Sequence, residues 1–131
     1  MHCVEYLLIG GYAVAYHSYP HATADMKNWI ALHPQNAARV VAALRAFRFA
    51  VPQLSTELFL KESQIVRMGL PPVRIEIVTG ISGVLFEECY AARVVDELDG
   101  VPVNLIDLAH LKQNKRAAGR HKDLNDLENL P

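Results

Sequence analysis

Apolar residues follow strand-like and helix-like periods that alternate along the chain. Residues 4–9 are almost continuously apolar and rich in β-formers, which is typical of a strand covered on both faces. Gly10 and Gly11 then release the backbone, and residues 12–19 fit about two helical turns. Residues 25–32 read as a second strand. The pattern predicts a strand, a glycine turn into a helix, and a second strand.

The later segments continue this alternation. Pro34 opens a helix in which apolar residues recur at helical spacing. Asp99-Gly100, between two β-rich segments, predicts a hairpin. Asp107 can cap a helix through Lys115, which Gly119 can end. The other expected elements are one helical turn at 55–59, strands at 64–68, 73–78, 94–98 and 101–106, a short helix at 86–92, and a last short helix beginning at Asp123.

Composition limits what this alternation can build. The 131 residues are 51% hydrophobic and 21% charged, enough for one core, so residues 1–131 are expected to form a single α/β domain. Thirteen Lys and Arg balance fourteen Asp and Glu, so no overall field draws the chain to nucleic acid or to an anionic membrane. Any anion site must be local.

The same data address location and redox state. No apolar run approaches the ~20 residues that span a bilayer, and the start lacks the features of a signal peptide. Cys3 and Cys89 form no paired spacing, so we expect small buried side chains in a reducing compartment. These features predict a cytoplasmic protein with no membrane partner.

Candidate chemistry begins at the second strand. Residues 25 and 27 of a strand point to one face with their Cα atoms ~6 to 7 Å apart, so two carboxylates there would clamp a divalent metal. Asp25 is such an acid, but position 27 is a lysine. Glu76, within the apolar strand at 73–78, is the best-placed acid to complete a site. Mg²⁺ takes few protein carboxylates and relies on nucleotide phosphates for other ligands.

Three ordered segments carry a resemblance to a known family. They are residues 8–17 with 22–25, residues 74–77 with 79–83, and residues 114–120 with Asp123-Leu124. Over nearly its whole length the chain resembles small bacterial nucleotidyltransferase-fold proteins, related to the minimal nucleotidyltransferases and to the nucleotidyltransferase toxins of abortive-infection systems. The resemblance implies a single domain of the α/β (α+β) class, with a nucleotidyltransferase-like mixed β-sheet and helices packed against it.

The resemblance also implies roles for particular residues. Gly10 and Gly11 would contact the triphosphate of a nucleoside triphosphate, and Asp25 and Glu76 would bind Mg²⁺ or Mn²⁺. Lys115 and Asp123 would line the pocket. The implied catalytic set is Asp25, Glu76, Lys115 and Asp123. Taken without the rest of the pattern, a glycine pair after a strand is more often only a tight turn.

Three departures from the family pattern bear on function. Lys27 stands where the family has its second metal-binding carboxylate. The lysine either forms a structural ion cluster with Asp25 and Glu76 or contacts a phosphate as a point charge. Glu76 replaces a more usual aspartate and keeps the ligand type. The first strand starts within a few residues of Met1, so the family's N-terminal helix is expected to be missing, leaving a surface that favours a partner.

The sequence leaves three functions open. The first is metal-dependent transfer of a nucleoside monophosphate from a nucleoside triphosphate to a hydroxyl of a protein or an RNA. The second is a degenerate, inactive member that binds nucleotide or a partner protein, as in toxin–antitoxin pairs. The third is an oligomerising domain, a homodimer for example, that uses the hairpin edge. Basic residues between Lys112 and Lys122 fit RNA or triphosphate binding, but also a helix C-terminus alone.

Overall fold

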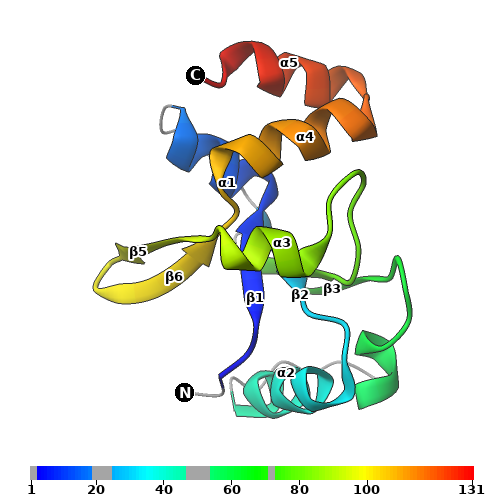
Figure 1. Cartoon of the computed structure of the whole chain (residues 1–131). Helices are drawn as coiled ribbons and strands as arrows, with labels where there is room; N and C mark the ends of the chain where they lie inside the picture. The colour runs from blue at the N-terminus through cyan, green and yellow to red at the C-terminus, as the bar shows by residue number, and fades with distance from the viewer. Residues whose placement is uncertain (1–2, 19–24, 47–53, 71–72) are drawn as a thin grey trace.

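A computed structural model describes residues 3–18, 25–46, 54–70 and 73–131 of the chain. It contains the alternation that the sequence predicts (Figure 1). The elements are β1 (Tyr6–Ile9), α1 (Gly10–His17), β2 (Asp25–Ile30), α2 (Pro34–Ala46), the 3₁₀ turn η1 (Thr56–Phe59), β3 (Ile65–Leu70), β4 (Val73–Val78), α3 (Phe86–Ala91), β5 (Val94–Leu98), β6 (Val101–Leu105), α4 (Leu108–Ala118) and α5 (His121–Asn129).

The six strands form one mixed sheet in the order β3-β4-β2-β1-β6-β5. Strand β1 runs antiparallel to β2 and parallel to β6, and β2 runs parallel to β4. The pairs β3–β4 and β5–β6 are antiparallel hairpins that form the two edges. The predicted single α+β domain with a mixed sheet is therefore confirmed.

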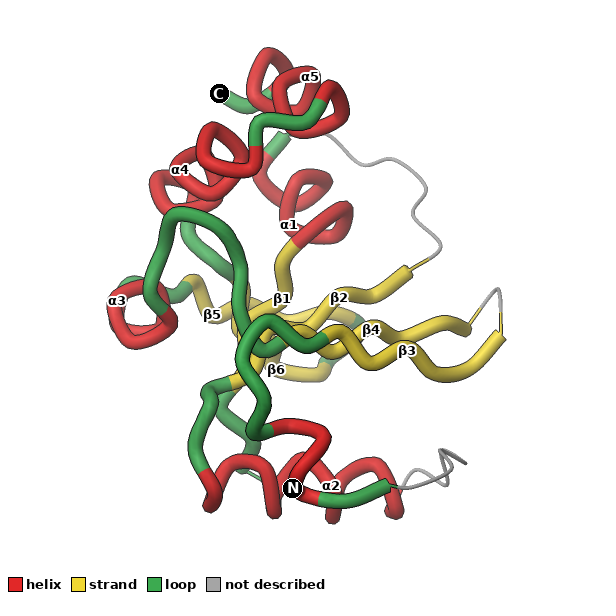
Figure 2. The backbone as a smooth tube through the Cα atoms, turned by 90° about the vertical axis from the view of Figure 1, so that its right-hand side faces the viewer, coloured by secondary structure: helices red, strands yellow, loops and turns green. Residues whose placement is uncertain are grey.

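Helices cover both faces of this sheet. Helices α1, α4 and α5 lie on one side, and α2 lies on the other (Figure 2). Each face has its own core, because successive residues of a strand point to opposite sides. Trp29 of β2 is buried in the core on the α1 side, and the next residue, Ile30, is buried in the core under α2. Trp29 is thus a core residue.

Asn36 fastens the end of the sheet opposite the α1 turn. Its buried side chain accepts the Glu5 N–H at 2.8 Å and donates to the carbonyls of Glu5 and Ala31 at 3.1 and 2.9 Å. The Asn36 N–H donates to Nδ1 of His33, whose other ring nitrogen lies 2.7 Å from the Glu5 carboxylate. These bonds join the start of β1, the end of β2 and the start of α2.

Several local expectations are corrected by the structure. Helix α5 begins at His121, because Asp123 is its third residue and accepts the Arg120 N–H at 3.2 Å instead of starting the helix. Helix α1 begins at Gly10 and ends at His17; Tyr19 lies outside the described residues, as do residues 22–24 of the family pattern. Cys3 is exposed, whereas Cys89 is buried.

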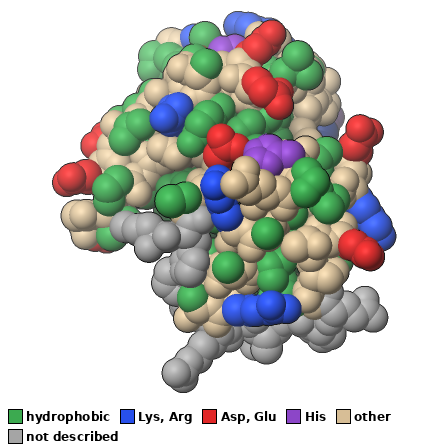
Figure 3. Space-filling view, turned by 60° about the horizontal axis from the view of Figure 1, so that its bottom comes forward, with side chains coloured by type: hydrophobic (Ala, Val, Ile, Leu, Met, Phe, Trp, Pro, Cys, Tyr) green, Lys and Arg blue, Asp and Glu red, His purple; other side chains and the backbone are tan. Residues whose placement is uncertain are grey.

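Two expectations for the ends of α4 hold. Asp107 caps α4 by accepting the His110 N–H, and Gly119 ends the helix in the left-handed conformation at φ 66°. In the described ranges, no helix combines the length and apolar character needed to cross a membrane. Figure 3, which brings the α2 side forward, shows acidic, basic and hydrophobic side chains intermixed on this face. This mixture agrees with a chain whose charges act locally.

Candidate functional site

The turn from β1 into α1 forms one wall of the candidate site. Ile9 ends β1 in an extended conformation, and Gly10 follows at φ +67°, which favours glycine whatever the space around it. The N-cap residue Ile9 makes no side-chain cap hydrogen bond to the first N–H groups of α1. Free N–H groups at a helix N-terminus attract anions. Gly10 itself lines a cavity, described below.

Three side chains form a charged row across β3, β4 and β2. Glu76 lies opposite Arg67 in the antiparallel pair and opposite Lys27 in the parallel pair. Arg67 Nε donates to Glu76 Oε1 at 2.9 Å, and Lys27 Nζ lies 3.6 Å from Glu76 Oε2. We call these residues, Arg67, Glu76 and Lys27, the strand cluster. Each carboxylate oxygen of Glu76 is held by a different cation.

The environment keeps Glu76 ionised. Burial alone would raise the pKa of this carboxyl, but the hydrogen bond from Arg67 and the positive charge of Lys27 together hold the pKa below its usual value. Glu76 is 6% exposed, whereas the side chains of Lys27 and Arg67 are 34% and 55% exposed. A buried anion therefore anchors two cations that reach solvent.

A second group of charges joins α4 to α5. Lys115 Nζ lies 3.3 Å from Asp123 Oδ1 and 3.1 Å from Asp126 Oδ2. Arg120 Nε donates to Asp123 Oδ2 at 2.7 Å. We call Lys115, Arg120, Asp123 and Asp126 the helix cluster. Burial acts to raise the pKa of Asp123, but the hydrogen bonds from Arg120 and Lys115 lower it overall.

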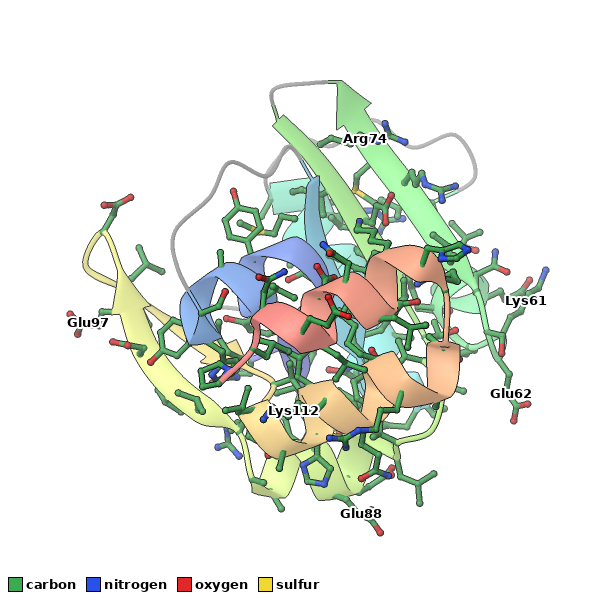
Figure 4. The ribbon with its side chains drawn as sticks, turned by 90° about the horizontal axis from the view of Figure 1, so that it is seen from above. Lys61, Glu62, Arg74, Glu88, Glu97 and Lys112 are labelled. Atoms are coloured by element: carbon green, nitrogen blue, oxygen red, sulfur yellow. The ribbon has the colours of Figure 1, made fainter. Side chains whose placement is uncertain are left out.

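A cavity of about 390 Å³ lies between the two clusters. Its apolar floor comes from the sheet and the loop after β4, and three cations, Lys27, Lys115 and Arg120, face it. Helices α4 and α5 lie over this side of the sheet in the view from above (Figure 4). No carboxylate is among its described lining side chains, which are those of Ile9, Lys27, Ile65, Val78, Ile81, Ser82, Asn114, Lys115, Ala118 and Arg120.

The loop between β4 and α3 closes one side of the cavity. Asn114 Nδ2 donates to the Ser82 carbonyl at 2.9 Å, and Gln113 Nε2 donates to the Gly83 carbonyl at 2.7 Å. Gly83 has φ +78°, and a Cβ there would lie 2.4 Å from the Cβ of Ala117. Only glycine fits this close approach of loop and helix. The second and third segments of the family pattern thus meet at this wall.

The opposite face of the sheet offers different chemistry. A cavity of about 260 Å³ lies there, lined by apolar side chains of the sheet and α2 together with Tyr6 and Asn28. No charged side chain is among its lining residues in the described part of the chain. The cation-lined cavity is therefore the candidate functional site.

The structure brings most of the predicted site residues to this cavity, in two layers. Gly10, Lys27 and Lys115 line it, and Gly11 follows in α1. Glu76 and Asp123 are buried next to it and hold its cations. The backbone of Asp25 starts β2 opposite Arg74, and its side chain lies outside the described side chains.

Three residues of this site are not among the site residues that the sequence predicts. Arg67 supplies the second cation of the strand cluster, Asp126 the second acid of the helix cluster, and Asn114 holds the loop wall. The spacing of Lys115, Asp123 and Asp126 on neighbouring helices carried a signal for Asp126, because residues three apart share a helix face. The sequence carried no such signal for Arg67, because its contact with Glu76 depends on the register of the two strands.

Lys27 pairs with Glu76, as expected if the lysine forms a structural ion cluster with Asp25 and Glu76. The Asp25 side chain lies outside the described side chains. Among the described residues, no group of three or more His, Cys, Asp or Glu side chains is arranged to hold a metal ion. The described cations next to Glu76 include the Lys27 ammonium and the Arg67 guanidinium.

Comparison with known proteins identifies the fold. No family model and no curated protein sequence matches the chain. A crystal structure of a Thermotoga maritima protein, described as a "putative nucleotidyltransferase", superposes with a TM-score of 0.61 at 15% sequence identity. The match covers 96% of this chain and 81% of that one. At this identity the likeness shows a shared fold, and the chain therefore has a nucleotidyltransferase-like fold.

Proposed function

We propose that this chain binds a nucleoside triphosphate, with the polyphosphate in the cavity between the strand cluster and the helix cluster. One observation carries the proposal: cations line the cavity, while the carboxylates Glu76 and Asp123 are buried next to it and hold those cations. Phosphate oxygens are acceptors that suit ammonium and guanidinium donors. The uncapped start of α1 at Gly10 adds backbone donors.

Lys27 gives this binding site its particular character. Its side chain is one-third exposed and lines the cavity at the position where the family would have a metal-binding carboxylate. A fixed positive charge there neutralises phosphate without a divalent metal. We propose a nucleotide-binding protein on an enzyme's fold, whose affinity for nucleotide does not depend on Mg²⁺.

The second candidate function is the metal-dependent transfer. In that reaction an acceptor hydroxyl of a protein or an RNA attacks the α-phosphorus, the bond to pyrophosphate breaks, and the hydroxyl proton leaves to solvent or a base. The shared fold and the position of Asp25, on the strand next to that of Glu76, favour it. Asp25 and Glu76 would hold Mg²⁺ or Mn²⁺, which would stabilise the charge that develops on the phosphate. Lys115 would then neutralise the leaving pyrophosphate.

Calorimetric titration with each of the four nucleoside triphosphates, in EDTA and in Mg²⁺, tests the binding proposal. We expect similar affinities in both buffers and a loss of about tenfold in Lys27→Ala. The matched control is Lys61→Ala, because Lys61 is an exposed lysine beyond η1 that is not among the residues lining the cavity. Binding that needs Mg²⁺, or that Lys27→Ala and Lys61→Ala affect equally, would contradict the proposal.

Transfer of α-phosphate label onto RNA and onto protein separates the two functions. Label transferred by the unaltered chain and lost in Asp25→Ala would establish the enzyme. Label that appears only in Lys27→Asp would show that the lysine replaced a working metal site, which supports the binding role. If the unaltered chain and Lys27→Asp both bind nucleotide and neither transfers label, the result also supports a protein that binds nucleotide without catalysis.

A further inference from the structure

The β5–β6 hairpin is a feature that the nucleotide site does not use. Strand β5 is the last strand of the sheet, so one of its edges has no partner strand in the described part of the chain. The hairpin extends to one side of the helical layers (Figure 1). On an edge strand, N–H and C=O groups point outward and can pair with another chain. The hairpin is therefore a candidate docking edge.

The side chains of this edge combine apolar and acidic character. Val95 is 61% exposed and Val101 is 55% exposed, a large exposure for β-branched residues. The hairpin from residue 94 to residue 105 carries Asp96, Glu97 and Asp99 and contains no lysine or arginine. A strand that pairs with β5 would thus contact both acidic and apolar side chains.

Two hydrogen bonds to the Asp96 carboxylate hold this edge in place before any partner binds. Tyr16 of α1 donates its hydroxyl proton to Asp96 Oδ2 at 2.6 Å, and Glu97 N–H donates to Asp96 Oδ1 at 2.7 Å. Since Asp96 is turned toward α1, Val95 and Glu97 point to the opposite face. A fixed edge costs less conformational entropy when a partner strand is added.

The charges decide which occupant fits. If two copies of β5 paired antiparallel in full overlap, Asp96 would lie opposite Asp96, and each Glu97 opposite a Val95. Like charges directly opposite each other destabilise a strand pair. A second copy of this chain is therefore a poor occupant. A basic strand would place its cations opposite Asp96 and Glu97 and an apolar residue opposite Val95.

We infer that β5 binds an extended segment of a partner protein in which two basic residues are followed by an apolar one, added antiparallel to the sheet. Main-chain hydrogen bonds would supply affinity, apart from the Glu97 N–H, which already donates to Asp96 Oδ1, and the acidic side chains would select the sequence. This inference does not rest on the proposed nucleotide site, because no residue of the hairpin lines that cavity in the described structure.

The probe is a fluorescein-labelled peptide with the repeating order lysine, lysine, valine, titrated into the full chain and followed by fluorescence anisotropy. We expect saturable binding, and Glu97→Lys should weaken it by about tenfold because an attractive charge pair becomes repulsive. Glu62→Lys is the matched control, since Glu62 is equally an exposed glutamate but lies on the other side of the molecule (Figure 4).

Amide hydrogen exchange then locates the bound peptide. Protection of β5 amides on peptide addition, absent in Glu97→Lys, would support the inference. An unaltered chain that does not bind the peptide would overturn it, and so would equal weakening by Glu62→Lys and Glu97→Lys, which indicates unspecific attraction. Sedimentation experiments on the same proteins measure self-association. If the unaltered chain self-associates and Glu97→Lys does not, β5 binds a second copy of this chain and the inference of a basic partner segment is overturned.

Discussion

Two charged clusters flank the same cavity, but they are built differently. The strand cluster sets two cations against one carboxylate, and both of its cations reach solvent. The helix cluster sets two cations against two carboxylates, and Lys115 and Asp123 are buried within it. The buried Lys115–Asp123 pair holds α4 to α5, whereas the two cations that share Glu76 can take up an anion. The contrast teaches that residues of one pocket can be divided between folding and binding.

Removing the buried acid of the helix cluster should have the largest effect. Asp123→Ala removes one partner of the buried Lys115 ammonium and the carboxylate that Arg120 contacts. We therefore expect a loss of about 3 kcal/mol in the free energy of unfolding. Urea unfolding followed by circular dichroism measures it. Asp126→Ala should cost less, because Asp126 is more exposed. Equal losses of stability in Asp123→Ala and Asp126→Ala would contradict the distinction between the buried and the more exposed acid of this cluster.

Removing a cation from the strand cluster should instead affect ligand binding. Lys27→Ala is expected to reduce nucleotide affinity by about tenfold, equivalent to ~1.4 kcal/mol, while the unfolding free energy changes by less than about 1 kcal/mol. Titration and urea unfolding on the same protein preparation test both halves. If Lys27→Ala binds nucleotide normally but is much less stable, the strand cluster has a structural role like that of the helix cluster.

Glu76→Gln sharpens the comparison by keeping the shape of the side chain. We expect a cost of about 1 kcal/mol in stability, because two half-exposed cations lose their anchor but can turn to water. Nucleotide binding in EDTA should persist, since the amide removes a negative charge that competes with phosphate for Lys27. If Glu76 were a required metal ligand for binding, affinity in Mg²⁺ would collapse in this variant.

Acid pH should expose the smallest difference. The pKa values of Glu76 and Asp123 are both lowered on folding. Each group therefore adds stability above its unfolded-state pKa, ~4.3 for Glu and ~3.9 for Asp, which is lost as the pH falls through the folded value. Urea midpoints between about pH 7 and about pH 3 should fall less steeply in Glu76→Gln than in the unaltered chain. Identical slopes would mean that Glu76 does not contribute.

Most of the fold could be predicted from local patterns. The cap at Asp107, the left-handed end at Gly119 and the hairpin turn at Asp99-Gly100 are short-range signals, and the structure contains all three. The start of α5 could not be read in the same way. Asp123 is a good cap type, but here its carboxylate accepts the Arg120 N–H from inside the helix.

The candidate site was only partly predictable, because pairing across the sheet fixes it. Lys27, Glu76 and Gly10 stand out in the sequence as a lysine out of pattern, an acid in an apolar strand and a glycine in a turn. Arg67 does not, since it lies on an exposed edge strand among other residues. It joins the site only through the register Arg67↔Glu76, which a one-residue slip would abolish.

The parallel pair between β1 and β6 has a consequence for how the chain folds. Leu8, near the start of the chain, pairs with Leu105, near its end, and β1 is an inner strand of the sheet. On a ribosome, β1 can join β2 early, but its other edge stays open until β6 has been made. The loop to be closed is long, so this pairing is expected to be slow. Chaperone protection during synthesis would then matter most for β1, which waits for β6.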